Sequence, residues 1–268
     1  MPSGSGWQPP YVVVYAPHER TRTLVRRALP HRRWHAAYAH TTAKFAGSFR
    51  AALVDAAIVD LAAPVETALG AAALARDFPT VPFFGLSPYL LGDTPTIARA
   101  VELEFADILA EGIDDAVLGA AVGAYAFTPR FISALRDPPP LLGLTHAIQL
   151  AAWRALLACP GRAVATAELA RRLGVTREHL SRSFRGGGAP TLKRVSDLVR
   201  LLAASRLAKN PGYDLDDVAR LLRFPSRAHL SRTARRLVGR TAASLPRLRT
   251  ADLLREFDHV GASSRRRD

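Results

Sequence analysis

A pattern of 17 residues occurs twice near the end of this chain, about 50 positions apart. The first copy is ELARRLGVTREHLSRSF, residues 168–184, and the second is DVARLLRFPSRAHLSRTA, residues 217–234, with Pro225 as one extra residue in its turn. Each copy predicts a short helix, a tight turn and a second helix, because Gly174 interrupts the first copy and Thr176 and Ser226 are favoured helix N-caps. The repeat therefore predicts two helix-turn-helix motifs in tandem.

The second helix of the first copy is expected to have two unlike faces. Leu180 and Phe184 share one face through their i, i+4 spacing. The opposite face carries Glu178, Arg182 and Arg185, with Ser181 at its edge. An apolar face that holds the helix and an Arg-rich face turned outward suit a helix that reads the major groove of DNA. An ordinary helical repeat with a solvated Arg face is the alternative, and the tandem occurrence argues against it.

The charge of the chain is distributed unevenly between its halves. Residues 1–140 carry a net charge of −1 and residues 141–268 carry +15, which together give the +14 of the whole chain. A basic half attached to a neutral half indicates that one domain meets a polyanion and the other has a different role. Arg supplies most of the positive charge, and its planar fork suits both phosphates and guanine edges.

Residues 143–250 resemble the DNA-binding domain of the AraC/XylS family of transcription regulators. The resemblance rests on the two motifs and on the spacer between them. The spacer carries four residues at the spacing typical of the family's linking helix: Arg200, Leu201, Ala204 and Leu207. Three positions depart from the family pattern, and two of them concern the packing of the second motif. Arg223 stands where Gly is usual, Ala234 where Phe is usual, and Ala242 where Pro is usual.

The resemblance implies which side chains meet DNA. In the first motif the residues expected to reach base edges are Arg177, Glu178, Ser181 and Arg182. In the second motif they are Arg227, Ala228, Ser231 and Arg232. Arg185 and Arg235 are expected to meet phosphates, and no base contact is expected from His179 or His229.

Five short apolar runs divide the N-terminal half of the chain. They are continuous rather than alternating, as in parallel strands that are buried on both faces, and amphipathic segments separate them. The runs are YVVVYA (11–16), WHAAYA (34–39), AAIVDL (56–61), VPFFGLS (81–87) and FADILA (105–110). They predict an α/β domain with a doubly wound, parallel, five-stranded sheet of flavodoxin-like type, commonly ordered 2-1-3-4-5, with a site at the carboxyl ends of the strands.

This half resembles the receiver domain of two-component response regulators. Asp60 ends the third run, where the family has its phosphate-accepting Asp, and Ser87 ends the fourth, where the family has Ser or Thr. The family's acidic pair aligns with Tyr15 and Ala16, and its Lys aligns with Glu111. Phosphoryl transfer needs cations at these positions, so we expect a pseudo-receiver. Asp60 is then expected to cap the next turn, and its phosphorylation is the less favoured alternative.

The expected domains follow from these patterns. They are a disordered tail (1–10), a receiver-like α/β domain (11–128), a Pro-rich linker (129–142), an all-α domain with two helix-turn-helix motifs (143–255) and a basic tail (256–268) whose last residues, GASSRRRD, are expected to be disordered.

These features together predict a sequence-specific DNA-binding transcription regulator. A phosphorylation-controlled response regulator that uses Asp60 is the runner-up, and a non-specific DNA-coating protein is an alternative of another class. We expect no enzyme activity and no cofactor, because no catalytic or metal-binding constellation stands out and Cys159 is the single cysteine. The expected partners are double-stranded DNA, a second copy bound through the N-terminal domain, and an unknown ligand or protein. No membrane partner is expected, and the expected location is the cytoplasm.

Overall fold

The structure is a computed structural model that describes residues 9–88, 95–159, 163–185 and 189–265. Contacts within the chain divide it into two compact units, one up to Arg130 and one from Phe131 onwards, with residues 210–212 as the exception. Nearly all of the tail expected at residues 1–10 lies outside the described residues. Within the described parts of the chain, no helix is both long and apolar enough to cross a membrane.

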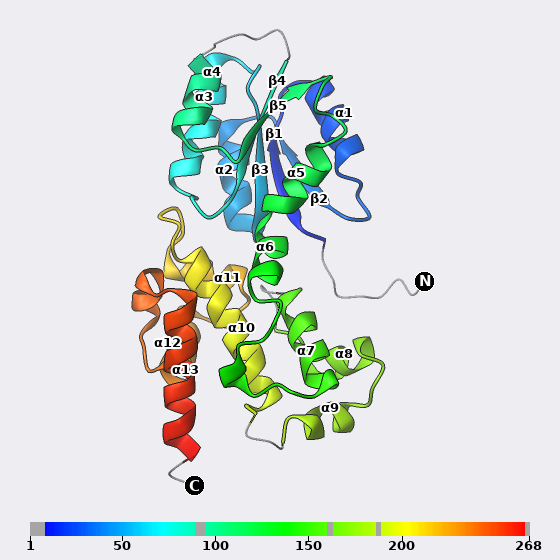
Figure 1. Cartoon of the computed structure of the whole chain (residues 1–268). Helices are drawn as coiled ribbons and strands as arrows, with labels where there is room; N and C mark the ends of the chain where they lie inside the picture. Colours follow the sequence, from blue (N-terminus) through cyan, green and yellow to red (C-terminus); the bar gives the residue numbers. More distant parts are fainter. Residues whose placement is uncertain (1–8, 89–94, 160–162, 186–188, 266–268) are drawn as a thin grey trace. The chain divides into compact units, whose positions relative to one another are not determined.

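The first unit is built on a five-stranded parallel sheet with the order β2-β1-β3-β4-β5 (Figure 1). The strands are β1 (Tyr11–Tyr15), β2 (His35–Ala39), β3 (Val54–Asp60), β4 (Phe83–Pro88) and β5 (Asp107–Glu111). The helices of this unit are α1 (Glu19–Ala28), α2 (Thr42–Ala51), α3 (Val65–Ala73), α4 (Pro95–Glu102) and α5 (Leu118–Tyr125), with a 3-10 turn η1 (Leu74–Arg76). The predicted doubly wound α/β fold is confirmed, and all five strands form within two residues of the predicted starts.

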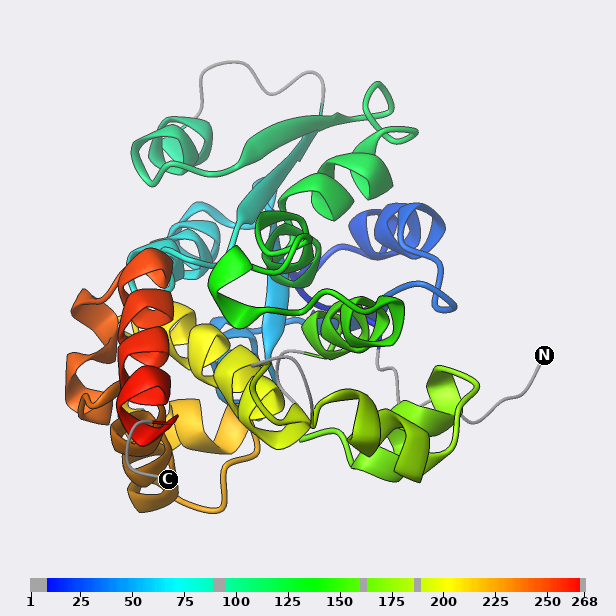
Figure 2. The same ribbon diagram turned by 60° about the horizontal axis from the view of Figure 1, so that its bottom comes forward.

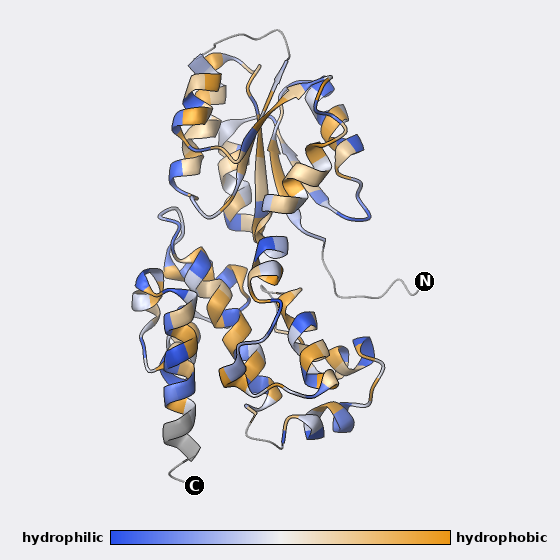
Figure 3. Cartoon of the chain, in the orientation of Figure 1, coloured by the Kyte–Doolittle hydropathy of each residue, from blue (hydrophilic) through white to orange (hydrophobic). Residues whose placement is uncertain are grey.

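Apolar side chains fill both faces of the sheet, as the continuous runs predicted. On one face, Val12 and Ile58 pack with Val25 of α1 and Leu118 of α5. On the other face Phe83 stacks on Phe49 of α2, with ring centroids 5.8 Å apart. Every residue of the central strand β3 is buried. Figure 1 shows α1 and α5 on one side of the sheet and α2 and α3 on the other, and Figure 3 shows the strands as mostly apolar.

Strand β3 begins two residues earlier than predicted, because a buried carboxylate is accommodated at its start. Asp55 accepts hydrogen bonds from the backbone nitrogens of Tyr11 at 2.8 Å and Thr128 at 2.8 Å. Burial raises the pKa of the Asp55 carboxyl, while hydrogen bonds from Thr128 and Tyr11 oppose that rise. The charged side chain therefore lies inside the sheet layer rather than ending the strand.

The second unit is helical. Its elements are α6 (Phe127–Ala134, which begins in the first unit), η2 (Pro140–Leu142), α7 (Ala147–Leu157), α8 (Thr166–Arg172), α9 (Arg177–Ser183), α10 (Leu192–Leu207), α11 (Leu215–Leu221), α12 (Arg227–Val238), η3 (Ala242–Arg247) and α13 (Thr250–Arg265). Figures 1 and 2 both show α10 between the pair α8–α9 and the group α11–α13. Leu198, Leu201 and Ala204 on α10 are buried in this core.

Two segments differ from the sequence prediction. The linker expected at residues 129–142 contains the second half of α6, because Phe131 and Leu135 are buried and the Leu135 carbonyl accepts a hydrogen bond from Trp153 Nε1 at 2.7 Å. The tail expected from residue 256 is helical as far as Arg265, so the disorder predicted for residues 261–265 is wrong. Leu253 and Phe257 bury one face of α13, which favours helix over a solvated tail.

Candidate nucleic-acid interface

The first motif consists of α8, a left-handed turn at Gly174 and α9. Gly174 has a φ of 67°, a conformation that glycine adopts without strain. The Thr176 side chain caps α9 by accepting a hydrogen bond from His179 N at 3.1 Å, as the sequence predicted. Ala170, Leu180 and Phe184 are buried, and they fix α9 against the rest of the motif.

The outward face of α9 is rich in Arg. Arg177, Glu178, Arg182 and Arg185 are exposed and Ser181 is half-buried at the edge of this face. Among the described residues, no carboxylate forms an ion pair with Arg177, Arg182 or Arg185. Their guanidinium groups are therefore available to an anionic partner.

The second motif consists of α11, a turn at Arg223 and α12. Arg223 has a φ of 54°, so it occupies the left-handed conformation that Gly174 takes in the first motif. Ser226 caps α12 by accepting a hydrogen bond from His229 N at 3.1 Å, as predicted. Leu230 and Ala234 are fully buried, so the small residue at the second position is accommodated in the core.

Arg200 on α10 stabilises the unusual turn of the second motif. Its Nη2 atom donates to the carbonyls of Leu222 at 3.0 Å and Arg223 at 2.8 Å. The guanidinium also lies over the Phe224 ring, 3.9 Å from the ring centroid. Burial lowers the pKa of Arg200, and the charge of Asp197 opposes that shift. The positive charge of Arg200 therefore lies against the carbonyls of Leu222 and Arg223. This contact stabilises the left-handed turn even though Arg223 carries a side chain.

The outward face of α12 repeats the pattern of α9 with one difference. Arg227, Ala228, Arg232 and Arg235 are exposed, and Ser231 is half-buried. Arg227 Nη1 lies 3.8 Å from an oxygen of Asp216, whereas Arg177 at the matching place in α9 has no ion pair among the described residues. Both partners of this pair are well exposed, so water screens it and an anion can compete for Arg227.

Residues 169–247, which run from α8 to η3, match a family model described as a helix-turn-helix domain. This region is a helix-turn-helix domain similar to that of the AraC/XylS family, as the two motifs predicted. The domain supports the prediction of a DNA-binding transcription regulator. A comparison with curated proteins found no match.

Solved structures of response regulators are similar to the chain at low identity. A response regulator from Burkholderia pseudomallei with a phosphorylated aspartic acid is 19% identical and has a TM-score of 0.36, over 65% of this chain and 97% of that one. Full-length FixJ from B. japonicum is 12% identical with a TM-score of 0.37, over 84% of this chain and 95% of that one. RcsB from Salmonella enterica serovar Typhimurium, bound to a promoter, is 13% identical with a TM-score of 0.36, over 70% and 97%. The sheet order of the first unit is that of flavodoxin-like folds, to which receiver domains belong.

Asp60 lies at the carboxyl end of the receiver-like sheet, and both of its oxygens have partners. Its Oδ1 accepts a hydrogen bond from Ala62 N at 3.1 Å, which is the turn-capping contact expected from the sequence. Its Oδ2 lies 2.8 Å from His18 Nδ1 and accepts a hydrogen bond from Thr21 Oγ1 at 2.9 Å. The Asp60 side chain has no exposed surface.

Glu111 joins the same network from the end of β5. Thr21 Oγ1 lies 3.1 Å from Glu111 Oε1, and Arg20 Nε lies 3.4 Å from Glu111 Oε2. Sequence reasoning placed Asp60 and Glu111 here but missed His18, Arg20 and Thr21. The signal was the polar run HERT (18–21), two residues after the end of β1, at the sheet edge where the ends of parallel strands meet.

Among the described residues, no group of three or more His, Cys, Asp or Glu side chains is placed to hold a metal ion. Tyr15 and Ala16 stand at the places of the acidic pair, and both are buried. Asp60 already has partners on both oxygens, and Ser87 is buried with its Oγ 3.4 Å from the Pro88 carbonyl. Hard cations need several oxygen ligands, and this edge offers few that are uncommitted.

Proposed function

We propose that the protein is a sequence-specific transcription regulator whose two reading helices enter successive major grooves on one face of DNA. The observation that carries the proposal is the repeated arrangement of a capped helix with a buried Leu and an exposed Arg-rich face, in α9 and α12. Successive major grooves on one face lie roughly 34 Å apart. Two helices reading them together bind a site with two separated blocks.

Each residue of the interface has a proposed role that its exposure supports. Base edges are assigned to Arg177, Glu178, Ser181 and Arg182 in α9, and to Arg227, Ala228, Ser231 and Arg232 in α12. Phosphates are assigned to Arg185 and Arg235, of which Arg185 follows the end of α9. His229 packs beside Phe224 with ring centroids 6.1 Å apart, which supports a packing role rather than base reading.

We further propose that phosphorylation of Asp60 does not control this regulator. A phosphoryl group on Asp60 Oδ2 would displace both His18 and Thr21 and bring its negative charge toward Glu111. The receiver Lys that would neutralise this charge is replaced by Glu111. His18 Nδ1 lies 2.8 Å from Asp60 Oδ2, so the ring already occupies the oxygen that a phosphoryl group would need.

Treatment of the full chain with acetyl phosphate and Mg²⁺ tests this part of the proposal. We expect intact-mass spectrometry to show no phosphorylated species and the affinity for DNA to stay unchanged. A phosphorylated species that disappears in the Asp60→Asn variant, together with a changed affinity for DNA, would contradict the proposal and establish phosphorylation control. The variant Glu111→Lys places a Lys where receiver domains have one, and it is treated in the same way for comparison with the parent chain.

We propose that the receiver-like domain acts by forming a homodimer. Its support is three exposed apolar side chains on the segments that precede and follow β5: Val101 on α4 is 65% exposed, and Ile113 and Val117 between β5 and α5 are 57% and 50% exposed. Burial of such side chains against a second copy would remove apolar surface from water. A dimer also tethers two DNA-binding domains and raises the effective concentration of the second at a paired site.

A further inference from the structure

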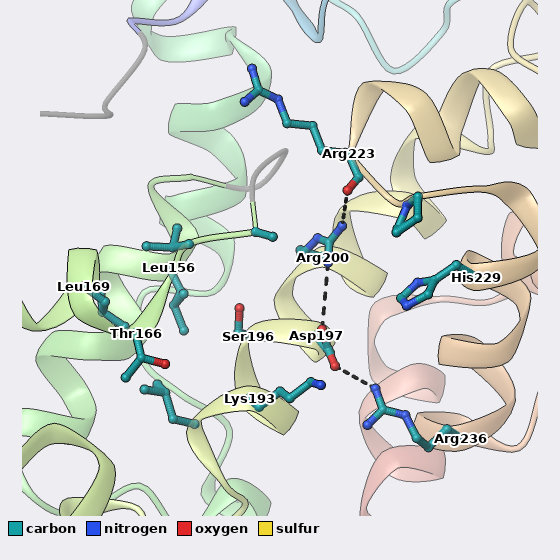
Figure 4. Close-up of a pocket in the computed structure, with 14 residues that line it drawn as sticks. Leu156, Thr166, Leu169, Lys193, Ser196, Asp197, Arg200, Arg223, His229 and Arg236 are labelled. Carbon is teal, nitrogen blue, oxygen red and sulfur yellow. Dashed lines mark hydrogen bonds and ion pairs between the residues drawn. The ribbon is translucent and has the colours of Figure 1, made fainter. Parts of the chain in front are cut away.

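A cavity of about 370 Å³ lies inside the helical unit, between the two helix-turn-helix motifs (Figure 4). It is bounded by α7 and α8 on the side of the first motif, by α10, and by the turn and the reading helix of the second motif. Pockets that bind small molecules have volumes of roughly 300–1,000 Å³. The cavity therefore has room for a ligand that touches both motifs at once.

The two sides of the cavity differ in chemistry. The side formed by α7 and α8 carries Leu156 and Leu169, and Leu192 adds a third apolar side chain at the start of α10. The side formed by α10 and α12 is polar and carries the labelled groups of Figure 4: Lys193, Ser196, Asp197, Arg200, His229 and Arg236. A ligand that fits both sides has an apolar body and a polar head.

Positive charge predominates on the polar side. Asp197 is the one carboxylate in the lining, and it pairs with Arg236 at 2.6 Å and with Arg200 at 3.9 Å. Within the described ranges no carboxylate pairs with Lys193, so its charge adds to an uncompensated excess. An anionic head group is the complement of this excess, since a charged hydrogen bond from Lys or Arg to a carboxylate is among the stronger ones.

Unused hydrogen-bonding capacity lies on the same side of the cavity. The buried Nδ1 atom of His229 and the buried Nε atom of Arg200 have no hydrogen-bond partner in the protein. Arg200 is only 5% exposed. Figure 4 shows the His229 ring turned toward Arg200 and Asp197. Buried polar atoms without partners are costly, so these two atoms mark a strongly polar wall behind this side of the cavity.

We propose that this cavity binds a small organic acid, with its carboxylate toward Lys193, Arg236 and His229 and its apolar body against Leu156, Leu169 and Leu192. The ligand would bridge the first motif and the reading helix of the second. Its binding would therefore be coupled to the relative placement of α9 and α12, and so to the affinity for a two-block DNA site. By thermodynamic linkage, DNA of that kind would change the affinity for the acid by the same factor.

Titration calorimetry on the full chain with 2-naphthoate and octanoate tests the proposal, with 2-naphthamide as the uncharged comparison. We expect saturable binding of at least one acid and at least tenfold weaker binding of the amide, because the amide lacks the charge that the cavity complements. The variant Ser196→Phe, which fills the cavity from a half-buried position, is expected to abolish acid binding. Saturable binding of neither acid, or equal binding of 2-naphthoate and its amide, would overturn the proposal.

Two Lys variants separate a ligand site from a DNA contact. Lys193→Met removes the charge but keeps most of the length of the side chain, and we expect it to weaken acid binding about tenfold, the equivalent of about 1.4 kcal/mol. Lys44→Met makes the same change on exposed α2 and is expected to leave acid binding unaltered. The proposal is wrong if Lys193→Met leaves acid binding intact. It is also wrong if no acid binds and Lys193→Met lowers the salt dependence of DNA binding, because Lys193 then contacts DNA.

Discussion

Arg182 and Arg185 are both exposed, and we propose different roles for them. Arg182 lies within α9, the proposed reading helix, whereas Arg185 follows the helix end at Phe184. A bidentate pair between Arg and guanine discriminates by about 1–3 kcal/mol, so Arg182→Ala should weaken operator binding by that amount and relax specificity at one position. Arg185→Ala should weaken binding to all sequences alike. It should also reduce the salt slope, the slope of the logarithm of the binding constant against the logarithm of the salt concentration, by about one.

Quantitative binding to the operator and to random DNA at several salt concentrations measures both effects. An unchanged operator preference in Arg182→Ala would show that this side chain does not read a base. Loss of specificity in Arg185→Ala would show that the two roles are reversed. Glu178→Gln, on the same face, is a useful third variant because it changes the charge while keeping the side chain's shape.

Gly174 and Arg223 form a matched pair, since both turns have a positive φ, of 67° and 54°. A residue with a side chain in the left-handed region costs roughly 1–2 kcal/mol, offset in part by the lower entropy of its unfolded chain. Arg223→Gly should therefore stabilise the domain by up to about 1 kcal/mol, while Gly174→Ala should destabilise it by a similar amount. No atom lies within 4 Å of a Cβ built at Gly174, so this change tests the conformation alone.

Chemical unfolding of the two variants decides the question. The carbonyl contacts of Arg200 involve only the backbone of Leu222 and Arg223, so Arg223→Gly retains them. A destabilised Arg223→Gly variant would mean that the Arg223 side chain contributes more than its turn costs. A Gly174→Ala variant as stable as the parent would mean that the first turn tolerates a side chain.

The contacts of single side chains were the part of the candidate site that the sequence predicted least well. The caps at Thr176 and Ser226 were predictable because they depend on residues three positions away. His18 and Asp60 are 42 positions apart in sequence, and their contact depends on how two strand ends meet. The sequence placed Arg200 only within the predicted linking helix. It did not show that this side chain would donate to carbonyls 22 and 23 positions away.

At the scale of elements, each reading helix depends on one leucine at its centre. Leu180 and Leu230 have no exposed surface. Replacing a packed core Leu by Ala costs on the order of 2–5 kcal/mol. Leu180→Ala and Leu230→Ala should therefore each lower the stability of the helical domain by that amount, as measured by chemical unfolding followed by circular dichroism.

Glu178→Ala is the matched control for Leu180→Ala, because Glu178 lies on α9 and is exposed. We expect this change to stay within about 0.5 kcal/mol of the parent. An unfolding curve for Leu180→Ala that coincides with that of the parent would mean that α9 presents a different face to the core. The assignment of Arg182 to the outer face would then also be wrong.

Elements were predictable from the sequence where a local pattern determines them. The five strands were, because parallel strands buried on both faces are continuously apolar. The start of β3 was not, because only the fold shows that the backbone of Tyr11 and Thr128 meets the carboxylate of Asp55. The helical end of the chain was missed for a similar reason, since the burial of Leu253 and Phe257 depends on packing from distant segments.

For the whole molecule, the proposed homodimer predicts that substitutions at the exposed apolar positions lower the molecular mass of the particle in solution. Val101→Asp combined with Ile113→Asp places charges on the exposed apolar group and should shift the full chain from dimer to monomer in light scattering. Val65→Asp, at another exposed apolar position, should leave the dimer intact. A parent protein that is monomeric at high concentration would contradict the dimer and favour control by a ligand or a protein partner.

We propose that α9 and α12 together read a two-block DNA sequence. Selection of sites by the full chain from random duplex DNA, followed by sequencing, tests it most directly. We predict enrichment of two short blocks whose centres lie about 10–10.5 base pairs apart, with the preference in one block relaxed in Arg182→Ala and in the other block relaxed in Arg232→Ala. Enrichment of no sequence at all, with binding that depends only on salt, would contradict the claim and indicate a protein that coats DNA through the charge of its arginines.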